Sequence, residues 1–127
     1  MITSLRILLV EDNPLNQKIV KFYISRDSHQ LRIASSGEEA LEIFSTEQFD
    51  VVLMDLMLPG IDGFETTLRM RSLETSWLNK SHSFIIALTA NTLDNDKERC
   101  IKHGMDEFLA KPFDINRFYY ILNKLSK

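Results

Sequence analysis

The sequence predicts one α/β domain built on a parallel β-sheet, and three observations lead to this fold class. Several short apolar runs have the length of buried strands. The stretches between these runs have helical periodicity, and each run is followed by a polar residue or a turn. The clearest runs are residues 7–10, 51–54, 85–88 and 108–110. Alternating strands and helices are typical of a parallel sheet that is covered by helices on both faces.

The first strand, 7–10, leads into a helix that begins at Asn13 and Pro14. Asparagine is a favoured N-cap residue, and proline is favoured at the first helical position. We expect polar residues to cover the outer side of this helix. The side that faces the sheet is expected to consist of Leu15, Ile19, Phe22 and Tyr23.

A short second strand is predicted at 31–34, followed by a helix that opens at Ser36 and Gly37. After the third strand, residues 59–63 contain proline and glycines and have the chemistry of a turn. A third helix is predicted over 64–73, and the polar stretch 74–83 is predicted to be a loop.

The last third of the chain repeats the pattern twice. After the fourth strand, a helix is predicted over 94–103, because Gly104 is a good residue to follow a helix end. A fifth strand over 107–110 and a last helix over 114–125 complete the alternation. No Gly/Ser-rich or Pro-rich linker divides the chain, so one domain is expected.

Composition narrows the classes of function. The chain has 127 residues and a net charge of −3, which argues against a broad nucleic-acid-binding face. No apolar stretch reaches the roughly 18 residues of a membrane span, and no signal peptide is visible, so we expect a cytoplasmic protein. The single cysteine, Cys100, excludes an internal disulfide, and the three histidines lack metal-ligand spacing.

Polar residues follow four of the predicted strands, where a parallel sheet gathers its functional groups. They are Glu11 and Asp12, Asp55, Thr89 and Lys111. Three acids in one place repel one another unless a cation compensates them. Mg²⁺ takes oxygen ligands and is commonly held by one or two carboxylates. The plain alternative is a solvated acidic patch that pairs with Lys111.

An aspartate beside Mg²⁺ can act as a nucleophile on phosphorus and form an aspartyl phosphate. Phosphoryl transfer depends mainly on positioning and on charge neutralisation. Lys111 and the metal would neutralise the phosphoryl oxygens, and the Thr89 hydroxyl could donate to one of them. No histidine base is needed, because a carboxylate is already deprotonated.

Four segments in this order resemble the receiver (response regulatory) domain of two-component signalling, most of all the receivers of hybrid sensor histidine kinases. They are 7–13, 53–63, 87–90 and 108–113. The resemblance implies a flavodoxin-like, doubly wound sheet of five parallel strands in the order 2-1-3-4-5, with five helices. It also implies one receiver domain over residues 1–127 and a cis bond before Pro112.

The resemblance also implies roles for single residues. Asp55 would accept a phosphoryl group from a phosphohistidine, and Lys111 would bind that group. The implied Mg²⁺ ligands are the side chains of Asp12 and Asp55, the backbone carbonyl of Met57 and, through water, Glu11.

Thr89 and Phe108 would be the switch residues that change the surface of helix 4, strand 5 and helix 5, although Phe108 could equally be ordinary core. Met57 and Asn91 flank the site at positions that influence phosphate lifetime in this family. Because Met57 cannot orient a water molecule by hydrogen bonding, we expect no unusually fast self-dephosphorylation. The domain would be a phosphoacceptor and not an enzyme.

The implied partner is a histidine kinase or a histidine phosphotransfer domain of a phosphorelay. The domain could stand alone or be covalently joined to a sensor kinase. Three rival functions remain: an aspartate phosphatase of the haloacid dehalogenase type, a phosphate-independent pseudo-receiver and a flavodoxin. The first lacks its Asp-x-Asp pattern, because Met57 follows Asp55 at that spacing. The second usually loses an acid or the lysine, and the third would not place Glu11 and Asp12 beside a phosphate.

Overall fold

The computed structural model describes residues 4–76, 82–90 and 94–125. Five parallel strands form one sheet in the order β2-β1-β3-β4-β5, which confirms the predicted topology. The strands are β1 (Arg6–Val10), β2 (Gln30–Ala34), β3 (Val51–Asp55), β4 (Phe84–Thr89) and β5 (Glu107–Ala110). Their register aligns Val10 with Met54 and Thr89 with Ala110, so the carboxyl ends of the strands lie at one edge of the sheet.

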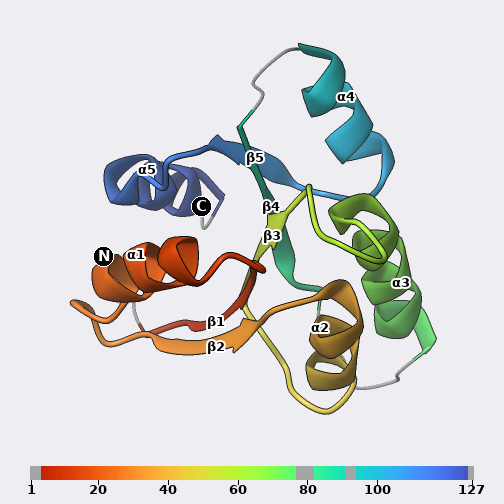
Figure 1. The fold of residues 1–127 in the computed structure, drawn as a ribbon, viewed down its shortest axis with the longest axis horizontal. Helices are drawn as coiled ribbons and strands as arrows, with labels where there is room; N and C mark the ends of the chain where they lie inside the picture. The colour runs from red at the N-terminus through yellow and green to blue at the C-terminus, as the bar shows by residue number, and fades with distance from the viewer. Residues whose placement is uncertain (1–3, 77–81, 91–93, 126–127) are drawn as a thin grey trace.

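Five helices cover the two faces of the sheet, as Figure 1 shows. They are α1 (Pro14–Ile24), α2 (Gly37–Phe44), α3 (Gly63–Ser76), α4 (Asp94–Lys102) and α5 (Ile115–Leu125). Helices α1 and α5 pack on one face, and α2, α3 and α4 pack on the other. Each face has its own apolar core, in which Phe118 and Phe44 are among the largest fully buried side chains. This double covering explains why β1 and β3 are nearly continuous apolar runs.

Side-chain caps fix where several helices begin. The Asn13 side chain accepts from the Leu15 and Asn16 N–H groups, and the Ser36 hydroxyl accepts from the Glu39 N–H. Asp114 caps α5, so this helix begins at Ile115, one residue later than predicted. Each cap satisfies backbone donors that a helix leaves without an intrahelical acceptor.

Helix α3 corrects the sequence prediction, because it continues to Ser76 where a loop was expected from residue 74. The carboxylate of Glu74 accepts from Arg71, one turn earlier, and from the N–H of Ser83. Polar side chains near the end of α3 thus bond to one another and to the segment before β4. A polar stretch with such contacts need not be a loop.

Helix α1 presents a different side to the sheet from the one predicted. Val20 and Ile24 are buried, whereas Leu15 is 66% and Phe22 is 61% exposed. The helix carries more apolar side chains than the sheet can cover. Positions 15 and 22 are two turns apart, so both lie on the same outward stripe.

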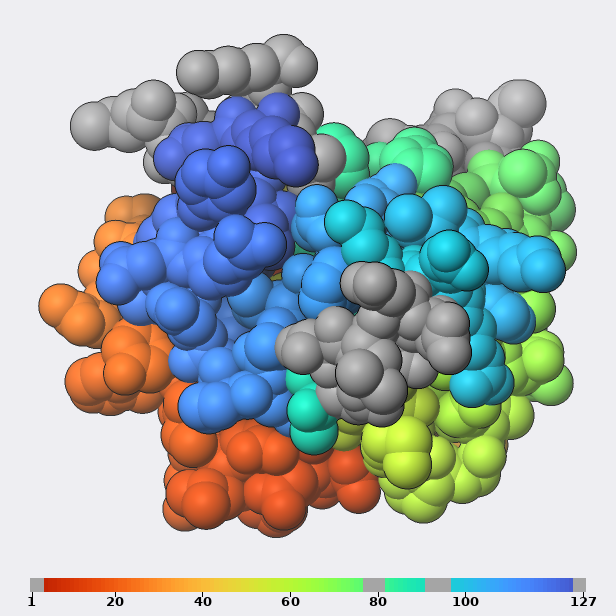
Figure 2. All heavy atoms as spheres, turned by 90° about the horizontal axis from the view of Figure 1, so that it is seen from above, coloured from red at the N-terminus to blue at the C-terminus, as the bar shows by residue number. Residues whose placement is uncertain are grey.

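The surface around β5 is formed by α4 and α5, and Figure 2 views the molecule from this side. The start of α1 and the loop that follows β3 lie along the lower edge of that view, and the segment around β5 lies above them. The Lys111–Pro112 bond in this last segment is cis, as expected. Among the helices of the described ranges, none combines the length and apolarity needed to cross a bilayer.

Candidate metal and phosphate site

Three acidic side chains meet at the carboxyl edge of the sheet. Glu11 and Asp12 follow β1 directly, and Asp55 is the last residue of β3. One carboxylate oxygen from each of the three lies within 4.8 Å of the other two. Glu11 and Asp55 are 1% and 2% exposed, whereas Asp12 is exposed at the rim. Oxygen ligands at this spacing suit a hard divalent cation such as Mg²⁺.

Lys111 brings a positive charge to the same edge from the end of β5. Its Nζ lies 3.2 Å from Glu11 Oε1 and 3.2 Å from Asp55 Oδ2. One ammonium group therefore faces three carboxylates. The cluster keeps a net negative charge, and this favours a cation in addition to Lys111.

The pKa values of the cluster reflect this balance. Burial raises the pKa of Glu11, and the nearby charge of Asp55 adds to this effect. The Asn13 N–H and Lys111 act in the opposite direction but do not cancel the rise. Burial alone would lower the pKa of Lys111, yet the Asp55 and Glu11 carboxylates outweigh it and the pKa is raised. Lys111 therefore stays charged.

Backbone groups orient the buried acids. Glu11 Oε2 accepts from the Asn13 N–H at 3.1 Å, and Asp55 Oδ1 accepts from the Met57 N–H at 3.0 Å. The loop after Asp55 returns close to the strand, because a Cβ on Gly63 would lie 2.4 Å from the Asp55 carbonyl oxygen. A larger residue at position 63 would push this loop away from the site.

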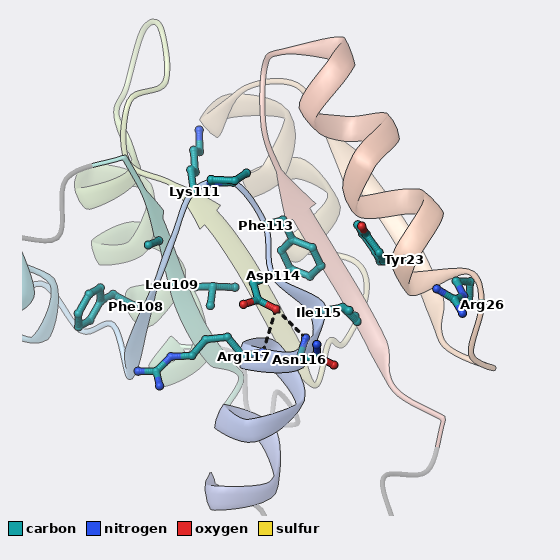
Figure 3. A pocket seen from close by; sticks show the side chains of 12 residues that line it. Tyr23, Arg26, Phe108, Leu109, Lys111, Phe113, Asp114, Ile115, Asn116 and Arg117 are labelled. Atoms are coloured by element: carbon teal, nitrogen blue, oxygen red, sulfur yellow. Dashed lines mark hydrogen bonds between the residues drawn. The ribbon is translucent and has the colours of Figure 1, made fainter.

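The remaining predicted residues surround the acids in different ways. Thr89 is 5% exposed at the end of β4, next to β5, and Met57 is 82% exposed on the loop after β3. The ring of Phe108 is half-buried and points away from Lys111 (Figure 3), with Lys97 Nζ 5.6 Å from its centroid. Phe108 is thus outside the acidic cluster. Asn91 lies outside the described residues.

A shallow pocket adjoins the site between α1, β5 and α5 (Figure 3). Phe113 and Tyr23 are among its apolar lining residues, and Asn116 and Arg117 line it from the start of α5. Phe113 and Pro112 also border a hollow along the exposed side of α1 that includes Phe22. An apolar surface therefore begins directly beside Lys111.

Sequence reasoning missed one residue that contacts the site. The side-chain Nε2 of Gln17 donates to the backbone carbonyl of Glu11 at 2.6 Å. It also donates to the Ser35 hydroxyl at 3.2 Å, in the segment that follows β2. Gln17 is one of the polar residues that the helical pattern assigns to the outer side of α1. Its position four residues after the N-cap Asn13, one helical turn into α1, was the signal that placed it near the site.

Comparison with known proteins agrees with this geometry. The family model "Response regulator receiver domain" matches residues 7–123. An alignment of 114 residues to hybrid signal transduction histidine kinase B of Dictyostelium discoideum has 41% identity and covers 84% of this chain and 6% of that protein. The chain covers 10%, 6% and 7% of three curated hybrid kinases that it matches, so it spans only a small part of those proteins.

Solved structures agree as well. One is the receiver domain of sensor histidine kinase PA1611 of Pseudomonas aeruginosa, which holds a magnesium ion in its active-site cleft. It is 34% identical to this chain, with a TM-score of 0.80, and the match covers 96% of this chain and 97% of that one. The receiver of Saccharomyces cerevisiae Ssk1, solved with the histidine phosphotransfer protein Ypd1, is 26% identical, with a TM-score of 0.85 and coverage of 94% and 86%. With this sheet order and this cluster of acids and lysine, the chain belongs to the response regulator receiver domain family.

Proposed function

We propose that residues 1–127 form one receiver domain that accepts a phosphoryl group on Asp55. One observation carries the proposal: the buried Asp55 carboxylate lies 3.2 Å from the Lys111 ammonium and in one cluster with the acids Glu11 and Asp12. An isolated buried carboxylate is costly, and the single charge of Lys111 cannot compensate three acids. An acid-rich cluster with a single lysine is better suited to hold a cation and a phosphoryl group.

Mg²⁺ is the cation that the donor set fits. Asp12 and Asp55 would hold it through their side chains, Met57 through its backbone carbonyl and Glu11 through water. When bound, the ion supplies charge neutralisation for the oxygens of the phosphoryl group.

The residues of the chain perform the transfer by position and charge. An Asp55 carboxylate oxygen attacks the phosphorus of a phosphohistidine, and the new O–P bond replaces the P–N bond, whose electron pair stays on the imidazole nitrogen. The Lys111 ammonium binds a phosphoryl oxygen, and the Thr89 hydroxyl donates to another. The domain is consumed and regenerated in this cycle, so it is a phosphoacceptor that assists its own reaction and not an enzyme with turnover.

The phosphorylated state would differ from the free state at β4 and β5. Phosphorylation adds nearly two negative charges and three acceptor oxygens. Thr89 would move towards them, and Phe108 would follow into the space that is vacated. Because the ring of Phe108 lies between β5 and Lys97 of α4, its movement would alter the surface formed by α4, β5 and α5.

The donor would be a histidine kinase or a histidine phosphotransfer domain. The histidine must reach Asp55 past Met57 on the loop after β3 and Leu15 at the start of α1, which are 82% and 66% exposed, and Phe22, two turns further along α1, is 61% exposed. Exposed apolar residues that gather beside a reactive group favour a protein partner. The kinase relatives and the yeast complex support this kind of partner, and the small fraction of each kinase that the chain spans supports a receiver joined to a sensor kinase.

Intact mass measurement tests the proposal. The protein is incubated with acetyl phosphate, with Mg²⁺ or with a chelator. We expect one added phosphoryl group that requires Mg²⁺ and is absent from Asp55→Asn. The matched control is Asp62→Asn, because Asp62 caps α3 through the Glu65 N–H and asparagine caps equally well. Addition to Asp55→Asn, or no addition to the unaltered protein, would overturn the proposal.

The lifetime of the phosphorylated form is a second measurement on the same sample. The side chain of Met57 cannot orient an attacking water molecule by hydrogen bonding. We therefore expect the added mass to persist well beyond seconds after the donor is removed. Loss within seconds would contradict this expectation for Met57 while leaving Asp55 as the acceptor.

A further inference from the structure

The side-chain amide of Gln17 joins two loops at the edge of the acidic cluster. Its Nε2 donates to the Glu11 carbonyl in the loop after β1 and to the Ser35 hydroxyl in the segment after β2. We propose that Gln17 is a positioning residue that holds the Glu11–Asp12 peptide in the orientation needed to bind the cation. This inference rests on the proposed function.

The argument begins with how Glu11 is held. Its N–H donates to the Ala34 carbonyl at 3.0 Å, and its carboxylate accepts from the Asn13 N–H and pairs with Lys111. Its carbonyl is held by the Gln17 amide at 2.6 Å. Backbone and side-chain groups of Glu11 are thus fixed separately, and Gln17 fixes the carbonyl.

Fixing that carbonyl sets the position of Asp12. The Glu11 carbonyl and the Asp12 N–H belong to one planar peptide unit, so rotating the carbonyl also rotates the unit from which Asp12 projects. Asp12 is exposed, whereas Glu11 and Asp55 are buried and held by packing. The exposed acid therefore depends more on its backbone for its direction than the other two acids do.

The chemistry of an amide suits this place. A glutamine donates two hydrogens without adding charge, so it braces the loop and leaves the net negative charge of the cluster intact. A lysine or arginine would hold the same carbonyl but would compete with the bound cation. Ser35, the other acceptor, is itself fixed because its N–H donates to the Glu39 carboxylate.

The test is a Mg²⁺ titration of the full chain. Binding is monitored through the backbone amide chemical shifts of Asp12 and Asn13 in NMR spectra. Gln17→Met keeps the length of the side chain and removes both donors. We expect its Kd for Mg²⁺ to rise about tenfold, the lower end of the effect of groups that orient metal ligands. Gln17→Asn keeps the amide but is one methylene too short, and we expect a similar rise. Ser35→Ala, which leaves the contact to Glu11, should raise the Kd by less.

The matched control is Gln30→Met, because Gln30 is exposed at the start of β2, at the opposite end of the sheet. Urea unfolding without Mg²⁺ separates positioning from a general loss of structure: we expect the Gln17 variants to unfold close to the unaltered midpoint. A Kd for Gln17→Met and Gln17→Asn within twofold of the unaltered protein would overturn the inference. So would a Kd that rises only in step with a lower urea midpoint. Failure of the unaltered protein to bind Mg²⁺ would instead overturn the proposed function.

Discussion

Each end of the sheet places a cation among carboxylates, but the two clusters are built differently. At the amino end, the Arg71 guanidinium bonds to Glu74 and Asp106, both at 2.8 Å, and to the carbonyls of Gly104 at 2.8 Å and Ser83 at 2.9 Å. Its planar fork of donors is matched by acceptors from α3, the residue before β4 and the turn before β5. The Arg71 cluster therefore has a structural role, because its hydrogen bonds connect α3 to the segments before β4 and β5.

At the carboxyl end, one lysine faces three acids. Lys111 Nζ is shared between Glu11 and Asp55, and Asp12 adds a further negative charge at the rim. The ammonium group cannot neutralise all three. The contrast shows how a structural ion-pair cluster differs from a binding site. At the amino end one guanidinium bonds to two carboxylates and two carbonyls, whereas at the carboxyl end one ammonium group stands against three acids and leaves more negative charge for a ligand to neutralise.

The largest expected change in unfolding free energy is at the amino end of the sheet. Arg71→Met leaves the Glu74 carboxylate, whose side chain is 7% exposed, without its guanidinium. Removing one partner of a buried pair typically costs about 3 kcal/mol of unfolding free energy. Urea denaturation measures this loss. The control is Arg69→Met two residues earlier, whose pair with Glu65 is about half exposed and should contribute less than about 0.5 kcal/mol. Equal losses in both variants would show that the Arg71 cluster is no stronger than a surface pair.

At the carboxyl end, we expect a substitution to increase the unfolding free energy. Asp12→Asn removes one of three repelling charges and should raise the unfolding free energy without Mg²⁺ by about 1 kcal/mol, as replacement of strained functional residues often does. Adding Mg²⁺ should stabilise the unaltered protein and reverse the order, because only its folded state binds the ion well. If Asp12→Asn were less stable than the unaltered protein without Mg²⁺, the two ends of the sheet would not differ as described.

The third prediction concerns pH. The pKa of Glu11 is raised in the folded protein, so its protonated form favours folding, and that contribution is lost as pH rises from the ordinary value of 4.5 through the raised one. The proton and the cation compete for the same cluster. We therefore expect the Mg²⁺ affinity to fall as the solution is acidified through this range. Calorimetric titration at several pH values measures it, and Glu11→Gln should flatten the profile; an unchanged profile would mean that another group titrates.

The smallest effect is expected at Tyr119, where α5 meets the loop after α1. Burial, together with the hydrogen bond to Asp27, raises the pKa of Tyr119 to about 12. Stability supplied by the neutral phenol is complete below about pH 10 and is lost as pH rises towards 12. Unfolding free energies measured across this range should fall less steeply for Tyr119→Phe. The neighbouring Tyr120→Phe is the control, because Tyr120 is 59% exposed, and an identical change there would contradict the role of Asp27.

Much of the fold and the site follows from local features of the chain. The apolar runs before Glu11, Asp55 and Lys111 set the strands, and the alternation with helices makes the sheet parallel. Parallel strands end at a common edge, so the order of residues places these charges together without knowledge of any contact. The cap at Asn13 and the helix start at Ser36 and Gly37 are equally local, and the structure confirms both predictions.

Local patterns thus predicted the sheet and the acids and lysine at its edge, and the family resemblance predicted the strand order. Four features emerged only from the folded chain: the side of α1 that faces the core, the extension of α3 through Glu74, the bonds of Arg71 at the amino end and the contact of Gln17 with the Glu11 carbonyl. The difference is one of range along the chain. Periodicity and capping act over a few neighbouring residues, whereas these contacts are chosen by packing between elements that the chain brings together only when it folds.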